Sequence, residues 1–198
     1  MNYYAVADEI ARLGTDGADP SPLGELLRRD ISSSQQMLTL LRETASNGNW
    51  YVRNQLAAHC IDVFKRSDRK PALGAGKLLW EARSERDGSG TIDMILMLVA
   101  WGIRAGAETT RHECVNLALM ALYGLDTLPA FSLPTSLYLI DSIYERAPWA
   151  VTSLRHRVLP SLQRAQAVAE SMKRNSEVAN ERLRRLSTLI DILTHIES

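Results

Sequence analysis

Residue types that could bind a metal ion occur together at two places, His59-Cys60 and His112-Glu113-Cys114. Zinc ligands on one helix need spacings of three or four residues, because only such positions share a helix face. Both groups have spacings of one or two residues, so their side chains point apart. Free cysteine often packs as a small hydrophobic residue. We therefore interpret both cysteines as core residues and expect neither a metal nor another cofactor.

The stretch 74–77, Gly-Ala-Gly-Lys, has the ending of a phosphate-binding loop. A complete loop would need glycine where Pro71 stands and serine or threonine where Leu78 stands. The sequence also lacks the Gly-x-Ser-x-Gly and His-Glu-x-x-His motifs of hydrolases. We therefore interpret the two glycines as helical residues and expect a protein that is not an enzyme. A catalytic site assembled from residues distant in the chain stays open as an alternative.

Internal similarity is the strongest signal in the sequence. Residues 109–115 align with residues 153–159 at an offset of 44, and both stretches contain Arg-His. A second offset of 58 residues aligns Arg53 with Arg111. Self-similarity at a period of about 40–47 residues is typical of stacked helix pairs, whose surfaces usually bind other molecules.

Apolar residues recur at helical spacing through nearly the whole chain, and glycine and proline fall between these stretches. The expected helices are a short one around residues 4–11, then 31–46, 50–66, 72–83, 91–105, 108–124, 135–147, one from about 150, and 176–196. Thr91 and Thr135 are expected to cap the helices that they open. Residues 84–90 contain no apolar side chain, so we expect a mobile loop there.

These patterns predict an all-α fold of stacked antiparallel helix pairs, a short solenoid. The alternative is an irregular multi-helix bundle. We expect one domain over residues 1–198, with an N-terminal helix and linker in 1–30, helix-pair repeats in 31–165 and a C-terminal cap in 166–198.

Composition excludes several classes of protein. Hydrophobic residues make up 45% of the chain and charged residues 23%, which is typical of a globular domain. The N-terminus lacks a signal-peptide pattern, the longest apolar run is about half of what a membrane span needs, and two cysteines provide no disulfide framework. We therefore expect a cytoplasmic protein without a membrane partner. Secretion by a route independent of a signal peptide stays open.

The net charge is zero, but its distribution is uneven. Residues 1–30 carry six acids and three bases, whereas residues 155–185 carry eight bases and three acids. The basic C-terminal third could contact nucleic acid.

A short stretch, Asn49-Trp50-Tyr51-Val52-Arg53, resembles the turn of HEAT repeats, in which an acidic or amide residue precedes Val-Arg at the start of the inner helix. The resemblance implies stacked helix pairs with a row of arginines. Arg53, Arg111 and Arg155 occupy the matching positions. The motif departs from the family at Thr110 and Leu154, which replace the valine.

Tryptophan and arginine are the residues that most often anchor protein interfaces. Trp50 and Trp149 fall at turns between helices, where a large aromatic side chain has little reason to be buried; packing of Trp50 on the neighbouring repeat is the alternative. The candidate partner-binding residues are Trp50, Tyr51, Arg53, Arg111, Trp149 and Arg155. We expect a structural role for Arg111 and a binding role for Arg53.

The expected function is that of a non-enzymatic protein–protein interaction module, such as an adaptor, an immunity-type inhibitor or an effector scaffold. The alternative is a HEAT-like nucleic-acid-binding protein that uses residues 155–185. The sequence does not specify the oligomeric state.

Overall fold

The computed structural model describes residues 3–13, 19, 21–46, 49–84, 86–123, 133–171 and 177–195. Within these residues the chain forms α-helices and one short 3-10 helix, η1, and no strand. The helices are α1 Tyr3–Leu13, α2 Ser21–Asp30, α3 Ser34–Thr44, α4 Trp50–Arg66, α5 Ala72–Ala82, α6 Ser89–Ala105, α7 Glu108–Tyr123, α8 Leu133–Arg146, η1 Pro148–Ala150, α9 Val151–Ser171 and α10 Glu177–His195. The predicted all-α fold is confirmed.

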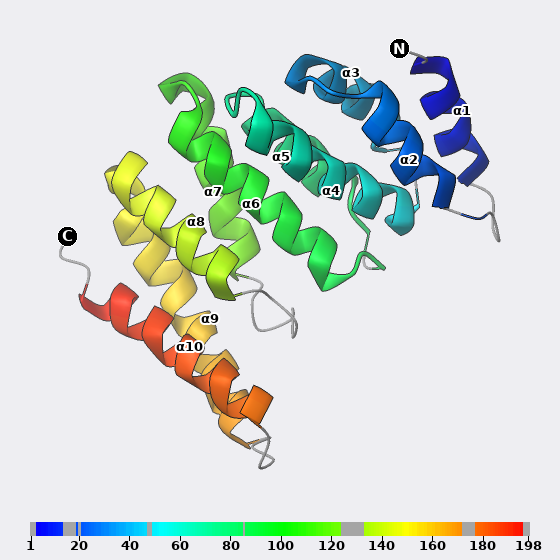
Figure 1. Ribbon diagram of the computed structural model, residues 1–198. Helices are drawn as coiled ribbons and strands as arrows, with labels where there is room; N and C mark the ends of the chain where they lie inside the picture. Colours follow the sequence, from blue (N-terminus) through cyan, green and yellow to red (C-terminus); the bar gives the residue numbers. More distant parts are fainter. Residues whose placement is uncertain are drawn as a thin grey trace.

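The helices stack in two layers (Figure 1). Each helix packs against the one after next, and all consecutive helices except α2 and α3 also pack against each other, so α1, α3, α5, α7 and α9 form one layer and the even-numbered helices form the other. Contacts restricted to neighbours along the chain are the property of a solenoid. The offset of 44 residues relates α7 to α9 and stays in one layer, whereas the offset of 58 relates α4 to α7 and crosses between layers.

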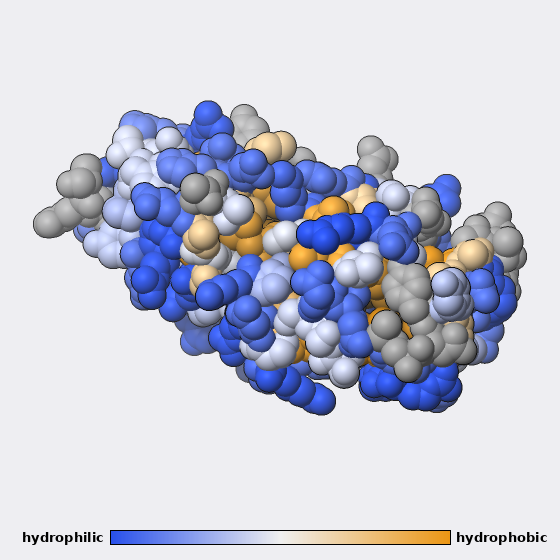
Figure 2. Space-filling model, turned by 90° about the horizontal axis from the view of Figure 1, so that it is seen from above, coloured by the Kyte–Doolittle hydropathy of each residue, from blue (hydrophilic) through white to orange (hydrophobic). Residues whose placement is uncertain are grey.

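Consecutive helices run in opposite directions, which gives the array two rims (Figure 1). The upper rim contains the C-terminal ends of the even-numbered helices and the N-terminal ends of the odd-numbered ones; the lower rim contains the opposite ends. Figure 2 views the molecule from the upper side and shows hydrophilic side chains over most of this face, with apolar atoms between them near the middle.

Helices α5 and α6 approach each other closely through glycines. A Cβ atom added to Gly102 of α6 would lie 2.2 Å from the Cβ of Leu73 and 2.4 Å from its Cα. A Cβ atom added to Gly76 of α5 would lie 2.9 Å from Val99 Cγ2. The glycines of the stretch 74–77 are therefore helical residues, as predicted, and Gly76 permits close helix packing.

The N-terminal segment differs from the prediction. Residues 21–30 were expected in a linker, but they form α2, which buries Leu23 and Leu27 and packs against α1 and α4. The turn signals near Pro20 and Pro22 suggested a loop. Proline in the first turn of a helix is nevertheless tolerated, because its missing N–H would have no intrahelical acceptor there.

The two predicted threonine caps are also wrong. Helix α6 begins at Ser89 with Gly88 as its N-cap, and Thr91 lies buried inside it, where its hydroxyl accepts a hydrogen bond from Asn54. Thr135 is likewise buried, two residues inside α8. No helix among the described residues combines the length and the apolar character needed to cross a membrane.

Candidate functional site

The structure divides the predicted partner-binding residues between the two rims. Trp50 and Tyr51 begin α4 at the lower rim, whereas Arg111, Trp149 and Arg155 belong to α7, η1 and α9 at the upper rim. A single binding edge that joins both tryptophans is therefore wrong, because successive turns of the array alternate between rims. Three of the six residues therefore lie at the upper rim, on elements that pack beside one another.

At the upper rim, the Trp149 indole stacks on the imidazole of His112. The ring centroids are 4.1 Å apart and the planes differ by 19°. His112 is exposed, and Trp149 remains 49% exposed although one face of its ring is covered. A large aromatic side chain is thus held in one orientation and remains accessible. We call Arg111, His112, Trp149 and Arg155 the aromatic site.

Arg111 joins the helices beneath this site. Its guanidinium donates hydrogen bonds to the carbonyl oxygens of Ile103 at 3.1 Å and Gly106 at 2.8 Å, at the end of α6, and of Arg146 at 3.1 Å, at the end of α8. The last carbonyl groups of a helix lack intrahelical donors and carry a partial negative charge. Arg111 therefore caps two helices of the other layer, a structural contribution of the kind expected for it.

Arg155 lies on α9, which packs beside α7. Its side chain is half-buried, and the described part of the chain provides it with no hydrogen-bond acceptor or carboxylate. Because a guanidinium presents several donors in a planar fork, Arg155 can offer them to a ligand beside the stacked rings.

His112 is a residue of this site that sequence reasoning missed. The Arg-His pair recurs at 111–112 and 155–156, but the predicted binding residues include only the arginine of each pair. Trp149 follows Pro148, which opens η1. No sequence spacing relates residue 112 to residue 149.

At the lower rim, Asn49 caps α4. Its Oδ1 accepts hydrogen bonds from the backbone N–H groups of Tyr51 at 2.9 Å and Val52 at 3.1 Å, and its Nδ2 donates to the Leu13 carbonyl at the end of α1. Trp50 is 44% exposed and meets the Tyr51 ring edge-on at 5.6 Å. Asn49, the amide residue of the HEAT-like stretch, thus fixes the start of α4 and links α4 to α1.

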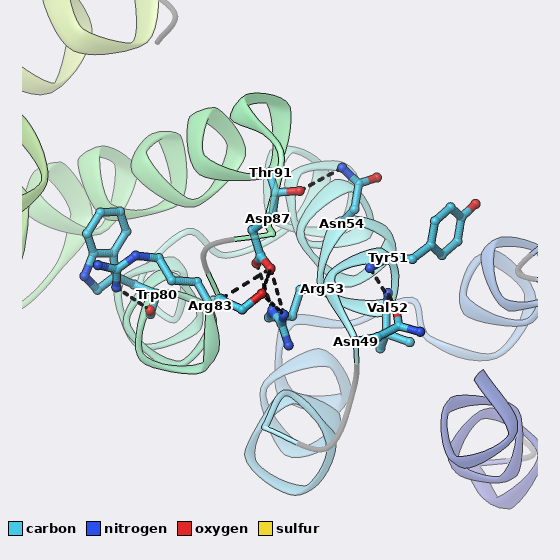
Figure 3. A network of polar contacts seen from close by, with 10 residues as sticks. Asn49, Tyr51, Val52, Arg53, Asn54, Trp80, Arg83, Asp87 and Thr91 are labelled. Carbon is cyan, nitrogen blue, oxygen red and sulfur yellow. Dashed lines mark hydrogen bonds and ion pairs between the residues drawn. The ribbon is translucent and has the colours of Figure 1, made fainter. Parts of the chain in front are cut away.

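Arg53 takes part in a buried polar network (Figure 3). Its Nε and Nη2 donate to the two carboxylate oxygens of Asp87 at 2.8 and 2.7 Å, and Nη2 also donates to Ser84 Oγ at 3.0 Å. The side chains of Arg53 and Asp87 are 5% and 0% exposed. Arg53 lies in the other layer from Arg111 and Arg155, so the expected row of three arginines is wrong, and its buried donors are already engaged.

This network anchors the connection between α5 and α6. Burial alone would raise the pKa of Asp87, but hydrogen bonds from Arg53 and Ser84, together with the charge of Arg53, hold that pKa below its ordinary value. Residues 84–90 were expected to be mobile because they contain no apolar anchor. The described residues of this stretch have a polar anchor instead, which removes the reason for that expectation.

The remaining chemistry-bearing residues lie in the core. Cys60 and Cys114 are fully buried, as predicted. The described residues contain no group of three or more His, Cys, Asp or Glu side chains that could hold a metal ion. Comparisons with protein-family models, curated proteins and solved structures give no match to this chain.

Proposed function

We propose that this chain is a non-enzymatic protein–protein interaction module, built from HEAT-like helix pairs, that binds its partner at the aromatic site. The observation that supports this proposal best is Trp149, which is half exposed and yet held by stacking on His112. Aromatic side chains provide a large contact area, and a ring that is already fixed loses little conformational entropy on binding. Tryptophan and arginine are also the residue types most enriched in interface hot spots.

The architecture supports the same proposal. Stacked helix pairs present a long, continuous surface on which side chains of successive helices line up. The capped ends of α6 and α8 give the aromatic site a rigid base, because Arg111 ties both ends to α7. The HEAT-like character rests on the Asn49–Arg53 turn, on the buried Val52 and on the two-layer stacking.

The test is affinity purification of the tagged chain from its native host. The variant Trp149→Ala should lose a protein that co-purifies with the wild type at fixed ratio. Trp50→Ala is the matched control, because it removes an equally exposed tryptophan from the opposite rim. Loss of the partner with Trp50→Ala alone would move the interface to the lower rim and refute the proposed site.

A second candidate is nucleic-acid binding through the basic C-terminal third. Its support is α9, on which Arg157 and Arg164 are exposed. Among the described residues of this helix, Glu170 is the single acidic one. Against it, Arg184 of α10 is paired with Glu181. Nucleic acid that co-purifies, and that dissociates as the salt concentration rises, would favour this second function.

A further inference from the structure

A group of basic side chains lies at the upper rim, far along the array from the aromatic site. It comes from the end of α2, the end of α4 and the connection that leads into α5. All of its members are exposed. We call this group the basic patch; it consists of Arg28, Arg29, Lys65, Arg66, Arg69 and Lys70.

The contributions of the separate segments lie close together. Helices α2 and α4 pack against each other, and the Arg28 guanidinium folds back over Gly24 beside Gln55 of α4. The packing of α2 against α4 brings the ends of these two helices, which carry Arg28, Arg29, Lys65 and Arg66, to neighbouring positions on the upper rim.

Most of this charge is uncompensated within the described residues. Arg29 donates to Asp30 at 2.8 Å, and the Arg69 guanidinium lies over the Trp101 ring at 4.7 Å from its centroid. For Arg28, Lys65, Arg66 and Lys70, the described part of the chain offers no carboxylate at ion-pair distance. Four cations are thus free to bind an anionic group.

Helix electrostatics explain only part of the patch. Cations in the last turn of a helix are favourable, which accounts for the bases that end α2 and α4. Arg69 and Lys70, however, immediately precede α5, where the helix dipole disfavours positive charge. Arg69 is stabilised at this position by its contact with the Trp101 ring, whereas Lys70 adds charge that the dipole of α5 disfavours.

We infer that the basic patch is a docking surface for an acidic segment of a partner protein, rich in aspartate and glutamate. Arginine matches carboxylates with its planar fork of donors. The exposed Asp62 and Asp68 belong to the same segments as the bases and would repel the closely spaced phosphates of a nucleic acid, whereas a peptide can place its carboxylates opposite the cations alone. One face of Trp101 is covered by Arg69, so it is not open for base stacking.

The test uses the full chain and a short fluorescein-labelled peptide of alternating glutamate and aspartate, followed by fluorescence anisotropy. The double variant Lys65→Glu/Arg66→Glu should weaken peptide binding at least about tenfold, and added salt should weaken binding by the wild type. The matched control is Arg42→Glu/Arg157→Glu, which changes the net charge equally at exposed positions of α3 and α9 and should weaken binding less than about threefold.

Several results would overturn the inference: no peptide binding by the wild type, equal weakening in both double variants, or tighter binding of a duplex DNA of similar length than of the peptide. If charge reversal unfolds the chain, Lys65→Gln/Arg66→Gln replaces it, with the same expected direction. Trp149→Ala should bind the peptide like the wild type. Failure of the peptide experiment would therefore leave the proposal for the aromatic site unchanged. Failure of the co-purification experiment with Trp149→Ala would likewise leave the inference about the basic patch unchanged.

Discussion

Removal of the charge on Asp87 should destabilise the protein more than any other exchange of one carboxylate for an amide in the described residues. In Asp87→Asn, the Arg53 guanidinium stays buried and keeps its donors, but it loses the anion that they bind. Breaking a buried ion pair from one side costs about 3–5 kcal/mol. For a chain of this size, each kcal/mol lowers the melting temperature by about 2–4 °C, so the expected fall is about 6–20 °C.

The matched control is Asp141→Asn. Asp141 also accepts a hydrogen bond from an arginine, Arg104, at 2.8 Å, but through one oxygen and with a side chain that is 60% exposed. Exposed ion pairs contribute little because water already solvates both charges. Urea denaturation of the two variants measures the difference. If both variants lost the same small free energy of unfolding, the buried pair would not be the anchor that we describe.

The same pair predicts a pH dependence. The pKa of Asp87 is lowered in the folded protein, whereas an unfolded aspartate has a pKa of about 3.9. A carboxylate with a lowered pKa contributes its full stabilisation above the unfolded value and loses it as the pH falls through the folded value. The gap in free energy of unfolding between wild type and Asp87→Asn should therefore be constant above about pH 5 and narrow below about pH 4. A gap that widens in acid would contradict the lowered pKa.

Three further predictions concern the packing of the array. Gly102→Ala should lower the free energy of unfolding by about 1–3 kcal/mol in urea denaturation, because its Cβ would overlap Leu73. Gly90→Ala, which has open space around it, should be neutral or stabilising. Equal effects of the two substitutions would argue against the close crossing of α5 and α6. Arg111→Met should lower the free energy of unfolding by about 1–3 kcal/mol in the same assay, because the hydrogen bonds to helix ends are lost. Arg155→Met should lower it clearly less. Burial raises the pKa of both thiols, that of Cys114 to about 12. Ellman's reagent at mildly alkaline pH should therefore react with Cys60 and Cys114 only after the protein unfolds. Rapid reaction of the native protein would show that at least one of the two thiols is accessible.

Most of the helices were predictable because their apolar residues recur at helical spacing. The expected range 50–66 coincides with α4, since Asn49 is a clear cap and the connection to α5 a clear stop. Helix α2 was missed because Pro22 and Gly24 obscured a short stripe of Leu23 and Leu27. In a sequence, a proline or glycine suggests that a helix is interrupted, because its position within the helix is not yet known.

The site was less predictable, because its geometry depends on which layer and rim each helix end occupies. Arg53 and Arg111 occupy similar positions in their helices, but α4 and α7 belong to different layers. Arg53 therefore meets Asp87, while Arg111 meets helix carbonyl groups. Pairs such as His112 with Trp149 lie 37 positions apart and follow from the stacking of α7 on α9.

Site-specific photo-crosslinking tests the central claim, partner binding at the aromatic site, most directly. A photoreactive residue at Ser153 lies one turn from η1 on α9, and the same residue at Gln163 lies farther along the same helix, also exposed. Irradiation of cells of the native host should give an adduct of one protein at position 153 and little or none at position 163, and Trp149→Ala should abolish it. Equal adducts at both positions, or an adduct that survives Trp149→Ala, would contradict the proposed interface.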